Sequence, residues 1–427
     1  MKYESPANPN YVATVIEVKA LNRLDRLDNL VSINAFGYQA LVSKDTQVGD
    51  VGVIFTAESQ LSEEFARENN LHRHTDRNRN PKESGYLEDS RRVKAIKLRG
   101  HNSNALFMPL SAFKYLKLKP EDFEVGDVFD KIAGHEIVKK YQLKEPGEHK
   151  GQTARIRKVD AKTFPVHLDT ENYWRNSHKI PQEAQVVVTQ KLHGTSARFG
   201  HVHIERDLTW KDRLAKWLGV EVSTHKVASV AGSRMVVKSI DGEAEDGKQH
   251  FYATDLWSEW AEKIKDVIPE NWLVYGEIVG FTSGGQPIQK GYTYNVAAAE
   301  SELYVYRVAT INAQGVMVDL SWDAVREFAV TNDLKYVPEL WRGPHSEFNP
   351  DDYVDNRFAD QGIHKPYPYK EYAVVLSDAK TVDEGVVVRY DVSYSPYLLK
   401  AKSPIFLGWE TAELDKGIID TESEESS

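Results

Sequence analysis

The sequence predicts an α+β protein of two domains, a small β-barrel followed by a larger domain of strands and helices. Its 427 residues exceed the length at which one hydrophobic core keeps growing, which predicts two domains. Short β-rich segments separated by polar turns fill residues 1–145 and are typical of a small barrel. Longer strand-like runs and two segments of helical spacing follow between residues 164 and 409.

The first domain contains four predicted strands and one predicted helix. The strands are residues 11–18, 39–42, 51–55 and 92–98. The helix covers residues 61–70, because Ser62 can cap it and acidic residues occupy its first turn. Residues 72–83 are polar and predict a mobile loop.

A linker of residues 146–163 leads to the second domain, which is expected to span residues 164–409. Its predicted strands are residues 186–189, 272–279, 303–311, 384–390 and 397–402, and its predicted helices are residues 255–267 and 322–331. Residues 197–232 resemble an insertion and contain a segment of helical spacing, for which partner contact and plain packing are both open. The acidic residues 410–427 predict a disordered tail.

Composition excludes several classes of function. The chain has no cysteine, which rules out disulfides, thiolate catalysis and cysteine-ligated metal sites. No run approaches 18 apolar residues, so no membrane span is expected. The first residues lack the apolar region of a signal peptide, and we expect a monomeric, cytoplasmic protein without a membrane partner.

Basic residues gather in the first domain although the chain as a whole is acidic. The net charge of −10 argues against a chain that is uniformly wrapped in nucleic acid. A local excess of cations between residues 85 and 120 nevertheless predicts contacts with a nucleic-acid backbone, and a solvated sheet face is the alternative. The candidate contacts are Arg91, Arg92, Lys94, Lys97 and Arg99.

Lys191 is the candidate nucleophile. It ends a strand-like apolar run and lies three residues before Gly194, whose missing side chain lets the backbone pass close to a ligand. A lysine free in water titrates near 10.4, so it must lose its proton before it can attack phosphorus. Taken alone, such a lysine is more often a solvated strand end.

Four further charged residues change that interpretation. Glu277 and Glu384 lie beside glycines at strand-like runs, where a buried carboxylate is costly unless it is paired or holds a metal. Lys400 and Lys402 alternate on a late strand, so both side chains lie on one face and can bind phosphate. The set predicts a site for nucleotidyl transfer with a divalent metal, although each glutamate alone can be a plain strand-end acid.

Three other residues are candidates for nucleotide contacts. Tyr304 and Tyr306 lie on an alternating strand, where stacking on a base and core packing are equally good interpretations. Arg234 follows a glycine and a serine and is a candidate for a ribose or phosphate contact.

These motifs, in this order, resemble those of ATP-dependent RNA ligases of the nick-sealing kind, within the covalent nucleotidyltransferase superfamily. The segments that carry the resemblance are residues 191–196, 233–234, 275–280, 303–308, 383–389 and 399–403. Residues 164–176 resemble the segment that precedes the nucleophile in these enzymes, and the first 120 residues resemble an OB module. The similarity is to the lineage in which the OB domain comes first, sometimes counted as the fifth RNA ligase family.

The resemblance implies an OB-type barrel followed by a nucleotidyltransferase domain of antiparallel sheets with flanking helices. It implies that ATP and Mg²⁺ or Mn²⁺ serve to join RNA 3′-OH and 5′-phosphate ends, as in a nicked duplex, through lysyl-AMP and RNA-adenylate intermediates. Glu277 and Glu384 would hold the metal, in part through water. The nucleotide would contact Arg175, Gln190, His193, Gly194, Arg234, Glu277, Tyr306, Glu384, Val386, Lys400 and Lys402.

The chain departs from the family pattern at three positions. His193 stands where some OB-first ligases have an aspartate that holds metal-bound water, Gln190 where a glutamate often precedes the lysine, and Arg307 where an aspartate is common. A capping-type guanylyltransferase and a non-catalytic RNA-binding protein with a decayed site remain alternatives. A DNA ligase is disfavoured because such enzymes place an OB domain after the last lysine motif, and a phage or virus is a fitting source.

Overall fold

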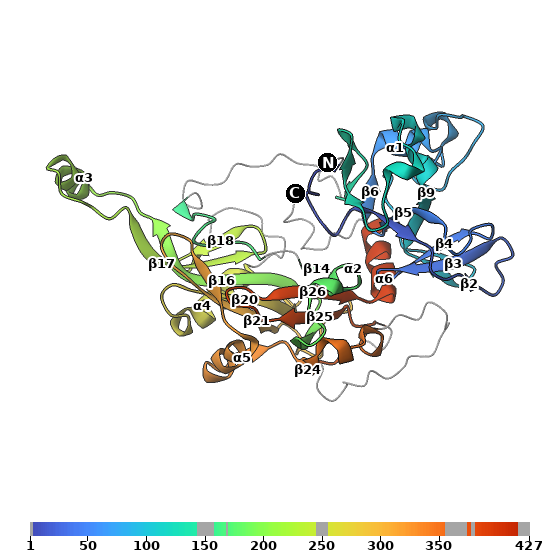
Figure 1. Cartoon of the computed structure of the whole chain (residues 1–427). Coiled ribbons are helices and arrows are strands. Elements are labelled where there is room, and N and C mark those ends of the chain that lie inside the picture. Colours follow the sequence, from blue (N-terminus) through green and yellow to red (C-terminus); the bar gives the residue numbers. More distant parts are fainter. Residues whose placement is uncertain are drawn as a thin grey trace.

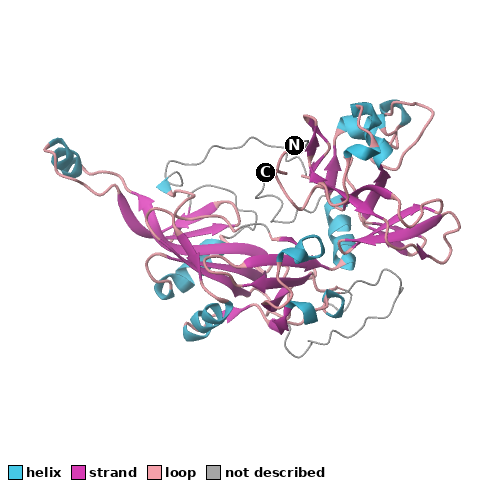
Figure 2. Cartoon of the chain, viewed as in Figure 1, coloured by secondary structure: helices cyan, strands magenta, loops and turns pink. Residues whose placement is uncertain are grey.

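Mixed α/β architecture with mainly antiparallel sheets makes up the computed structural model (Figures 1 and 2). It describes residues 3–142, 158–167, 170–244, 255–354, 374–376 and 381–416. Most of the predicted linker and the end of the acidic tail, residues 417–427, lie outside these ranges. Hydrophobic clusters form separately in the part before residue 142 and in the part after residue 158.

Short strands dominate the first 140 residues, as the sequence predicts. They are β1 (Ala13–Glu17), β2 (Asn22–Arg23), β3 (Leu30–Ala35), β4 (Tyr38–Ser43), β5 (Val51–Thr56), β6 (Ser59–Leu61), β7 (Ile96–Leu98), β8 (His101–Ser103), β9 (Ala105–Pro109), β10 (Val128–Phe129), β11 (Lys131–Ile132), β12 (His135–Glu136) and β13 (Val138–Lys140). The main sheet has the order β10-β1-β5-β9, and β2-β3-β4 form a second sheet. Phe55, Phe65 and Phe113 fill the core beneath the main sheet.

The expected barrel is not closed by a continuous backbone ladder among the described residues. The strands divide into the two sheets above and three two-stranded pairs. Side chains replace the ladder between β4 and the β8–β9 corner, since the Gln39 N–H donates to Asn104 Oδ1 (2.7 Å) and the Leu41 N–H to Ser103 Oγ (3.2 Å). These contacts hold the two sheets together but leave the ladder interrupted.

Two segments of this region differ from the prediction. Of the strand expected at residues 92–98, only β7 forms, and Arg92 makes an isolated bridge to Gln60. The polar loop of residues 72–83 contains a 3-10 helix at Thr75–Arg77 and is tied together by the Asn78 amide, which donates to backbone oxygens of His72 and Glu83. The predicted helix forms as α1 (Glu63–Glu68), and Ser62 caps it.

Two sheets build the second part of the chain. The eight-stranded sheet contains β16 (Thr195–Glu205), β17 (His225–Ser233), β18 (Val237–Ile240), β19 (Glu243–Ala244), β20 (Trp272–Gly280), β21 (Ser301–Ile311), β22 (Met317–Asp319) and β23 (Lys335–Tyr336). The five-stranded sheet contains β14 (Glu171–Asn172), β15 (Gln185–Lys191), β24 (Glu339–Pro344), β25 (Gly385–Tyr390) and β26 (Tyr397–Lys402). All five strands predicted for this part are confirmed.

Five helices accompany these sheets: α2 (Tyr173–Asn176), α3 (Trp210–Trp217), α4 (Leu256–Ile264), α5 (Trp322–Thr331) and α6 (Pro404–Asp415). The helices predicted at residues 255–267 and 322–331 are confirmed, and Asp255 and Ser321 cap them. The predicted disordered tail is wrong at its beginning, because Glu410–Asp415 belongs to α6. No helix of the described ranges has both the length and the apolar character needed to cross a membrane.

Helix α6 joins the two parts of the chain. It follows β26 directly and lies between the second part and the strands of the first 140 residues (Figure 1). The Thr411 hydroxyl donates to Glu58 Oε1 (2.7 Å), and Arg92 Nη1 donates to Asp415 Oδ1 (3.0 Å). The last strand of the catalytic sheet is thereby tied to the first domain.

Candidate active site

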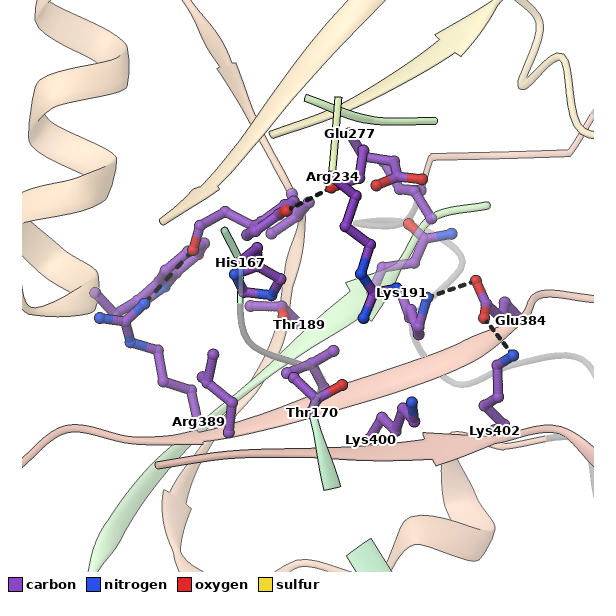
Figure 3. A pocket seen from close by; sticks show the side chains of 18 residues that line it. His167, Thr170, Thr189, Lys191, Arg234, Glu277, Glu384, Arg389, Lys400 and Lys402 are labelled. Carbon is purple, nitrogen blue, oxygen red and sulfur yellow. Dashed lines mark hydrogen bonds and ion pairs between the residues drawn. The ribbon is translucent and has the colours of Figure 1, made fainter. Parts of the chain in front are cut away.

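A pocket lies between the two sheets of the second part, and its walls carry most of the motif residues (Figure 3). β15, β25 and β26 supply one wall, and β16, β20 and β21 supply the other. The residues that line it are His167, Thr170, Thr189, Gln190, Lys191, Leu192, Ser196, Arg234, Glu277, Tyr306, Trp322, Val337, Glu384, Val387, Arg389, Leu398, Lys400 and Lys402.

Lys191 is the last residue of β15, and its amine points into this pocket. β15 and β25 are antiparallel, with Lys191 opposite Gly385. This register places Glu384, the residue before β25, beside the lysine, and Nζ of Lys191 lies 2.8 Å from Oε2 of Glu384. The Lys191 side chain is 18% exposed, so a ligand in the pocket can reach it.

Glu384 holds two lysines with one buried carboxylate. Its second oxygen, Oε1, lies 3.0 Å from Nζ of Lys402, and its side chain is 3% exposed. Burial alone would raise the pKa of Glu384, but the charges of Lys191 and Lys402 hold that pKa well below its usual range. The carboxylate therefore stays ionised, and the cluster of two cations and one anion leaves a positive charge facing the pocket.

Lys400 and Lys402 lie on one face of β26, as their alternation predicts. Both side chains line the pocket (Figure 3). β26 pairs with β25, and Lys402 stands opposite Gly385. Lys402 also lies 3.2 Å from Oε1 of Glu410 on α6, so the same amine bridges the pocket and the helix.

Glu277 faces this cluster from the opposite wall. It lies in β20, is 8% exposed, and accepts a hydrogen bond of 2.9 Å from the backbone N–H of Gly194. A Cβ at Gly194 would lie 2.2 Å from the carbonyl oxygen of Ile278, so only glycine fits this close approach of the two strands. The glycine of the nucleophile motif thus positions a carboxylate across the pocket from the lysine.

His193 lies behind the pocket wall and not on it. Its ring packs edge-on against Tyr292, Phe406 and Trp409, with ring centroids 4.8, 4.9 and 5.5 Å apart. Nδ1 is 3.7 Å from Oε2 of Glu384. The histidine therefore reaches the pocket only through this glutamate.

Gln190 lies in the pocket floor, with the side chain tied to the next loop. Its Nε2 donates to Oδ1 of Asp383 (2.8 Å) and to the Val374 carbonyl (3.0 Å), while Oε1 accepts from the Val374 N–H (2.8 Å). These three bonds satisfy a buried amide and hold Asp383, the neighbour of Glu384, in place.

The far end of the pocket is aromatic. Tyr306 lines it, with its hydroxyl 3.1 Å from that of Ser196 and its ring 5.0 Å from that of His167. Tyr304 instead bonds Glu302 with its hydroxyl (2.6 Å) and does not line the pocket. Of the two tyrosines that the sequence left open, Tyr306 is therefore the one that can meet a base.

Family comparison decides the kind of enzyme to which this pocket belongs. A family model described as RNA ligase matches residues 184–402, just over half of the chain and the segment that supplies nearly all of the pocket. The chain belongs to the RNA ligase family. Ligation of RNA is thus favoured over the guanylyltransferase and the non-catalytic binding protein, and the chain is an enzyme whose substrate is RNA.

The ligase fold is also found in solved structures. A variant of the Naegleria gruberi RNA ligase with ATP and Mn has a TM-score of 0.56 at 16% identity, covering 93% of this chain and 98% of that one. The same ligase with PPi has a TM-score of 0.56 at 18% identity, covering 94% and 99%. At such identities the likeness shows the fold alone. No curated protein sequence matches the ligase.

Two candidate nucleotide contacts lie away from the main pocket. Arg175, on α2, donates to the carbonyl of Pro9 (2.9 Å), lies 5.1 Å over the ring of Phe36, and lines a second pocket that shares Lys400 and Lys402 with the first. Val386 is fully buried in the core of the five-stranded sheet, because the alternation of β25 turns its neighbour Val387 to the pocket.

Arg307, the third departure from the family pattern, also faces away from the pocket. It is buried, donates from Nη2 to Oδ2 of Asp319 (2.9 Å), and lies 4.8 Å over the ring of Tyr275. This ion pair is a core contact of the eight-stranded sheet. The pocket contains residues that the sequence did not single out, namely His167, Thr170, Trp322 and Leu398.

The basic cluster of the first domain is largely engaged in ion pairs. Arg92 is 3% exposed and donates to both oxygens of Glu58 at 2.7 Å, so it is not available to nucleic acid. Arg91 pairs with Glu63, and Lys94 with Glu88 and Asp415. Exposed positions in this cluster are left to Lys97 and Arg99.

The pocket fits a metal that is shared with a substrate. No group of three or more metal-ligating side chains occurs among the described residues. Mg²⁺, however, binds enzymes through one or two carboxylates together with waters and substrate phosphates. Glu277 and Glu384 on facing walls supply those two carboxylates. A divalent ion bound there would neutralise charge that develops on phosphate oxygens.

Proposed function

We propose that the ligase is ATP-dependent and joins RNA 3′-OH and 5′-phosphate ends by way of a covalent lysyl-AMP. The observation that supports this most is the bridge Lys191–Glu384–Lys402 at one end of a pocket whose other end is aromatic. One end suits a phosphate chain and the other suits a base. Naegleria gruberi RNA ligase, which shares the fold, is known with ATP, Mn and PPi.

Three transfers at phosphorus make up the reaction. Lys191 Nζ, once deprotonated, attacks the α-phosphate of ATP, a P–N bond forms, and pyrophosphate leaves as the P–O bond breaks. The oxygen of an RNA 5′-phosphate then attacks the same phosphorus, which releases Lys191 and forms a P–O–P bond. The 3′-OH finally attacks the RNA phosphate, a phosphodiester forms, and AMP leaves.

Lys191 is held in an ion pair before ATP binds, and this has a chemical consequence. A lysine in contact with a carboxylate at 2.8 Å favours its charged form, which cannot attack phosphorus. A phosphate chain or a divalent ion that engages Glu384 weakens this contact and frees the amine to lose its proton. Lys400 and Lys402 then face the phosphates.

The remaining residues divide between base, ribose and support. Tyr306 stacks on adenine, while Glu277 and Arg234 contact the ribose or the phosphates. Gln190 and Gly194 hold the backbone around the nucleophile, and His193 and Val386 act through their packing behind the pocket. Arg175 in the second pocket, which adjoins the first at Lys400 and Lys402, takes the end of the triphosphate.

We further propose that the first 145 residues form an OB-type module, that residues 146–163 link it to a catalytic domain of residues 164–409, and that the ligase acts as a monomer inside the cell. The two sheets of the module, joined at Gln39 and Asn104, support an OB relationship. Lys97 and Arg99 would contact the backbone of a nicked RNA duplex.

The test is adenylylation of the protein. Incubation with radiolabelled ATP and magnesium should give an acid-stable protein–AMP adduct, and Lys191→Ala should give none. Lys179→Ala, which removes an amine paired with Glu171 outside the pocket, is the matched control and should label normally. Equal labelling of Lys191→Ala would overturn the mechanism, and preferential labelling by GTP would indicate guanylyl transfer.

A further inference from the structure

The two strands that flank the nucleophile continue into an arm that leaves the body of the molecule (Figure 1). β16 begins at Thr195, immediately after the nucleophile motif, and β17 ends at Ser233, next to Arg234 in the pocket. Both strands belong to the large sheet at this end. Beyond His201, β16 is no longer paired with β20, and the hairpin continues with two strands only.

The arm is built to be stiff. A two-stranded ribbon alone is marginally stable, but Val202 and Ile204 pack on Phe164 in a common cluster. The Thr163 hydroxyl donates to the His203 carbonyl (2.8 Å), which braces the ribbon from one side. With eleven residues in β16, the arm reaches roughly 35 Å from the nucleophile.

Helix α3 forms the tip of this arm and is held by its polar residues. Thr209 and Asp212 form a capping box at its start, and Arg206 grips the same carboxylate with two bonds of 2.8 and 3.0 Å. No residue of α3 is buried. Its apolar side chains therefore contribute nothing to the packing of the arm.

Those apolar side chains form one exposed face. Trp210, Leu214, Trp217 and Leu218 follow helical spacing and are 71, 47, 80 and 64% exposed. Trp217 is the most exposed large apolar side chain among the described residues. An apolar face that is left open at the end of a stiff arm marks a binding surface.

The charges around this face select its occupant. Lys211, Arg213 and Lys216 are exposed, and in the described part of the chain none of them lies within salt-bridge distance of an acid, whereas the acid of the helix, Asp212, is already occupied by Arg206. Exposed tryptophans interleaved with cations bind unpaired bases by stacking and their phosphates by charge. An eight-residue helix is about 12 Å long, too short to supply the roughly 800 Å² per partner of a stable dimer.

We propose that α3 is a second RNA-binding site of the ligase, which takes unpaired bases of the substrate about one helical turn from the ends that are joined. Trp210 and Trp217 stack on the bases, and Lys211, Arg213 and Lys216 contact the adjoining phosphates. The site deepens the proposed function and rests on it, since the RNA held at α3 is the RNA that is sealed. It selects broken RNAs that carry a loop or a single-stranded extension near the break.

The test compares two nicked RNA duplexes, one fully paired and one with a single-stranded extension about one turn from the nick. For the wild-type ligase, we expect the extension to lower the KM of sealing. In Trp210→Ala/Trp217→Ala the extended substrate should show a KM about tenfold higher, with kcat and the KM of the paired substrate unchanged. Tyr394→Ala, which removes an aromatic side chain that is 72% exposed elsewhere, is the matched control and should change neither.

Three further measurements decide against the rival interpretations. Quenching of tryptophan fluorescence by an oligouridylate should be lost in the double variant, and neutralising Lys211, Arg213 and Lys216 should reduce the salt dependence of this binding. Equal KM values for wild type and double variant on the extended substrate overturn the proposal. So does loss of binding to phosphatidylserine vesicles, or of self-association in sedimentation, without any effect on RNA.

The readouts separate this site from the proposed function. The double variant should form the protein–AMP adduct at the wild-type rate. If the wild-type protein forms no adduct, the proposed mechanism fails, whereas oligouridylate quenching still reports on α3.

Discussion

Two ion-pair networks meet at α6, and they differ in what lies beside them. In the first, Lys191, Glu384, Lys402 and Glu410 alternate in charge along the edge of an open pocket. In the second, Arg92, Glu58 and Asp415 are enclosed between the first domain and the helix, and the Arg92 side chain is 2% exposed. Similar residue types at similar distances thus form a site that a ligand can enter and a contact that it cannot.

The difference shows that local charge density alone does not identify a nucleic-acid surface. Residues 91–99 are rich in cations, yet burial and acidic partners consume Arg92 and engage Lys94. The lysines of the pocket are also paired, but Lys191 and Lys402 keep exposed fractions of 18 and 20%. Access of the charged atoms, together with charge, distinguishes the two networks.

Breaking the pocket network should have the largest effect on activity. Glu384→Gln removes the charge that positions Lys191 and Lys402, and we expect the rate of protein–AMP formation to fall about 10²-fold. Glu302→Gln, in which a carboxylate paired with Lys335 outside the pocket is neutralised, should remain near wild type. A Glu384→Gln protein that labels at the wild-type rate would show that the bridge does not position the nucleophile.

Breaking the enclosed network should instead reduce stability. Arg92→Ala leaves Glu58 buried without its bidentate partner, which is expected to lower the free energy of unfolding by about 3–5 kcal/mol. Urea denaturation measures this, with Arg77→Ala at a more exposed ion pair as control, for which less than about 1 kcal/mol is expected. The folded fraction of Arg92→Ala should still form lysyl-AMP, and loss of adduct at full folding would contradict the distinction.

At the aromatic end of the pocket, Tyr306 tests the binding of the base. Tyr306→Ala should raise the KM for ATP about tenfold, as expected for the loss of one stacking contact, while kcat changes less. Tyr306→Phe keeps the ring and loses only the hydroxyl contact to Ser196, so its KM should stay close to that of the wild type. Equal KM values for all three proteins would place the base elsewhere.

The smallest effect concerns pH. The pKa of Glu384 is depressed in the folded protein, so its charge contributes stability that is fully present above the ordinary value of 4.5 and is lost as pH falls towards the folded value. Thermal unfolding measured from pH 6 to pH 3 should therefore show a steeper loss for the wild type than for Glu384→Gln. Parallel curves would mean that Lys191 and Lys402 do not stabilise the carboxylate.

Much of the site could be predicted from the order of its motifs. Lys191, Glu277, Glu384, Lys400 and Lys402 line one pocket although 211 positions separate the first from the last. The helix starts at Ser62 and Ser321 were also readable, because a capping side chain acts within one turn. These are properties of residue type and short-range spacing.

Tertiary structure alone decided which side chains face the pocket. Alternation groups Tyr304 with Tyr306 and separates Val386 from Val387, but a period of two does not say which face of a strand another sheet covers. The pairing of β16 with β17 across the insertion, the burial of Arg92 and the place of His193 behind Glu384 depend on contacts between residues far apart in sequence. The amino-acid sequence thus determined the chemistry of this ligase, whereas long-range strand pairing and burial decided which of its charges a substrate can reach.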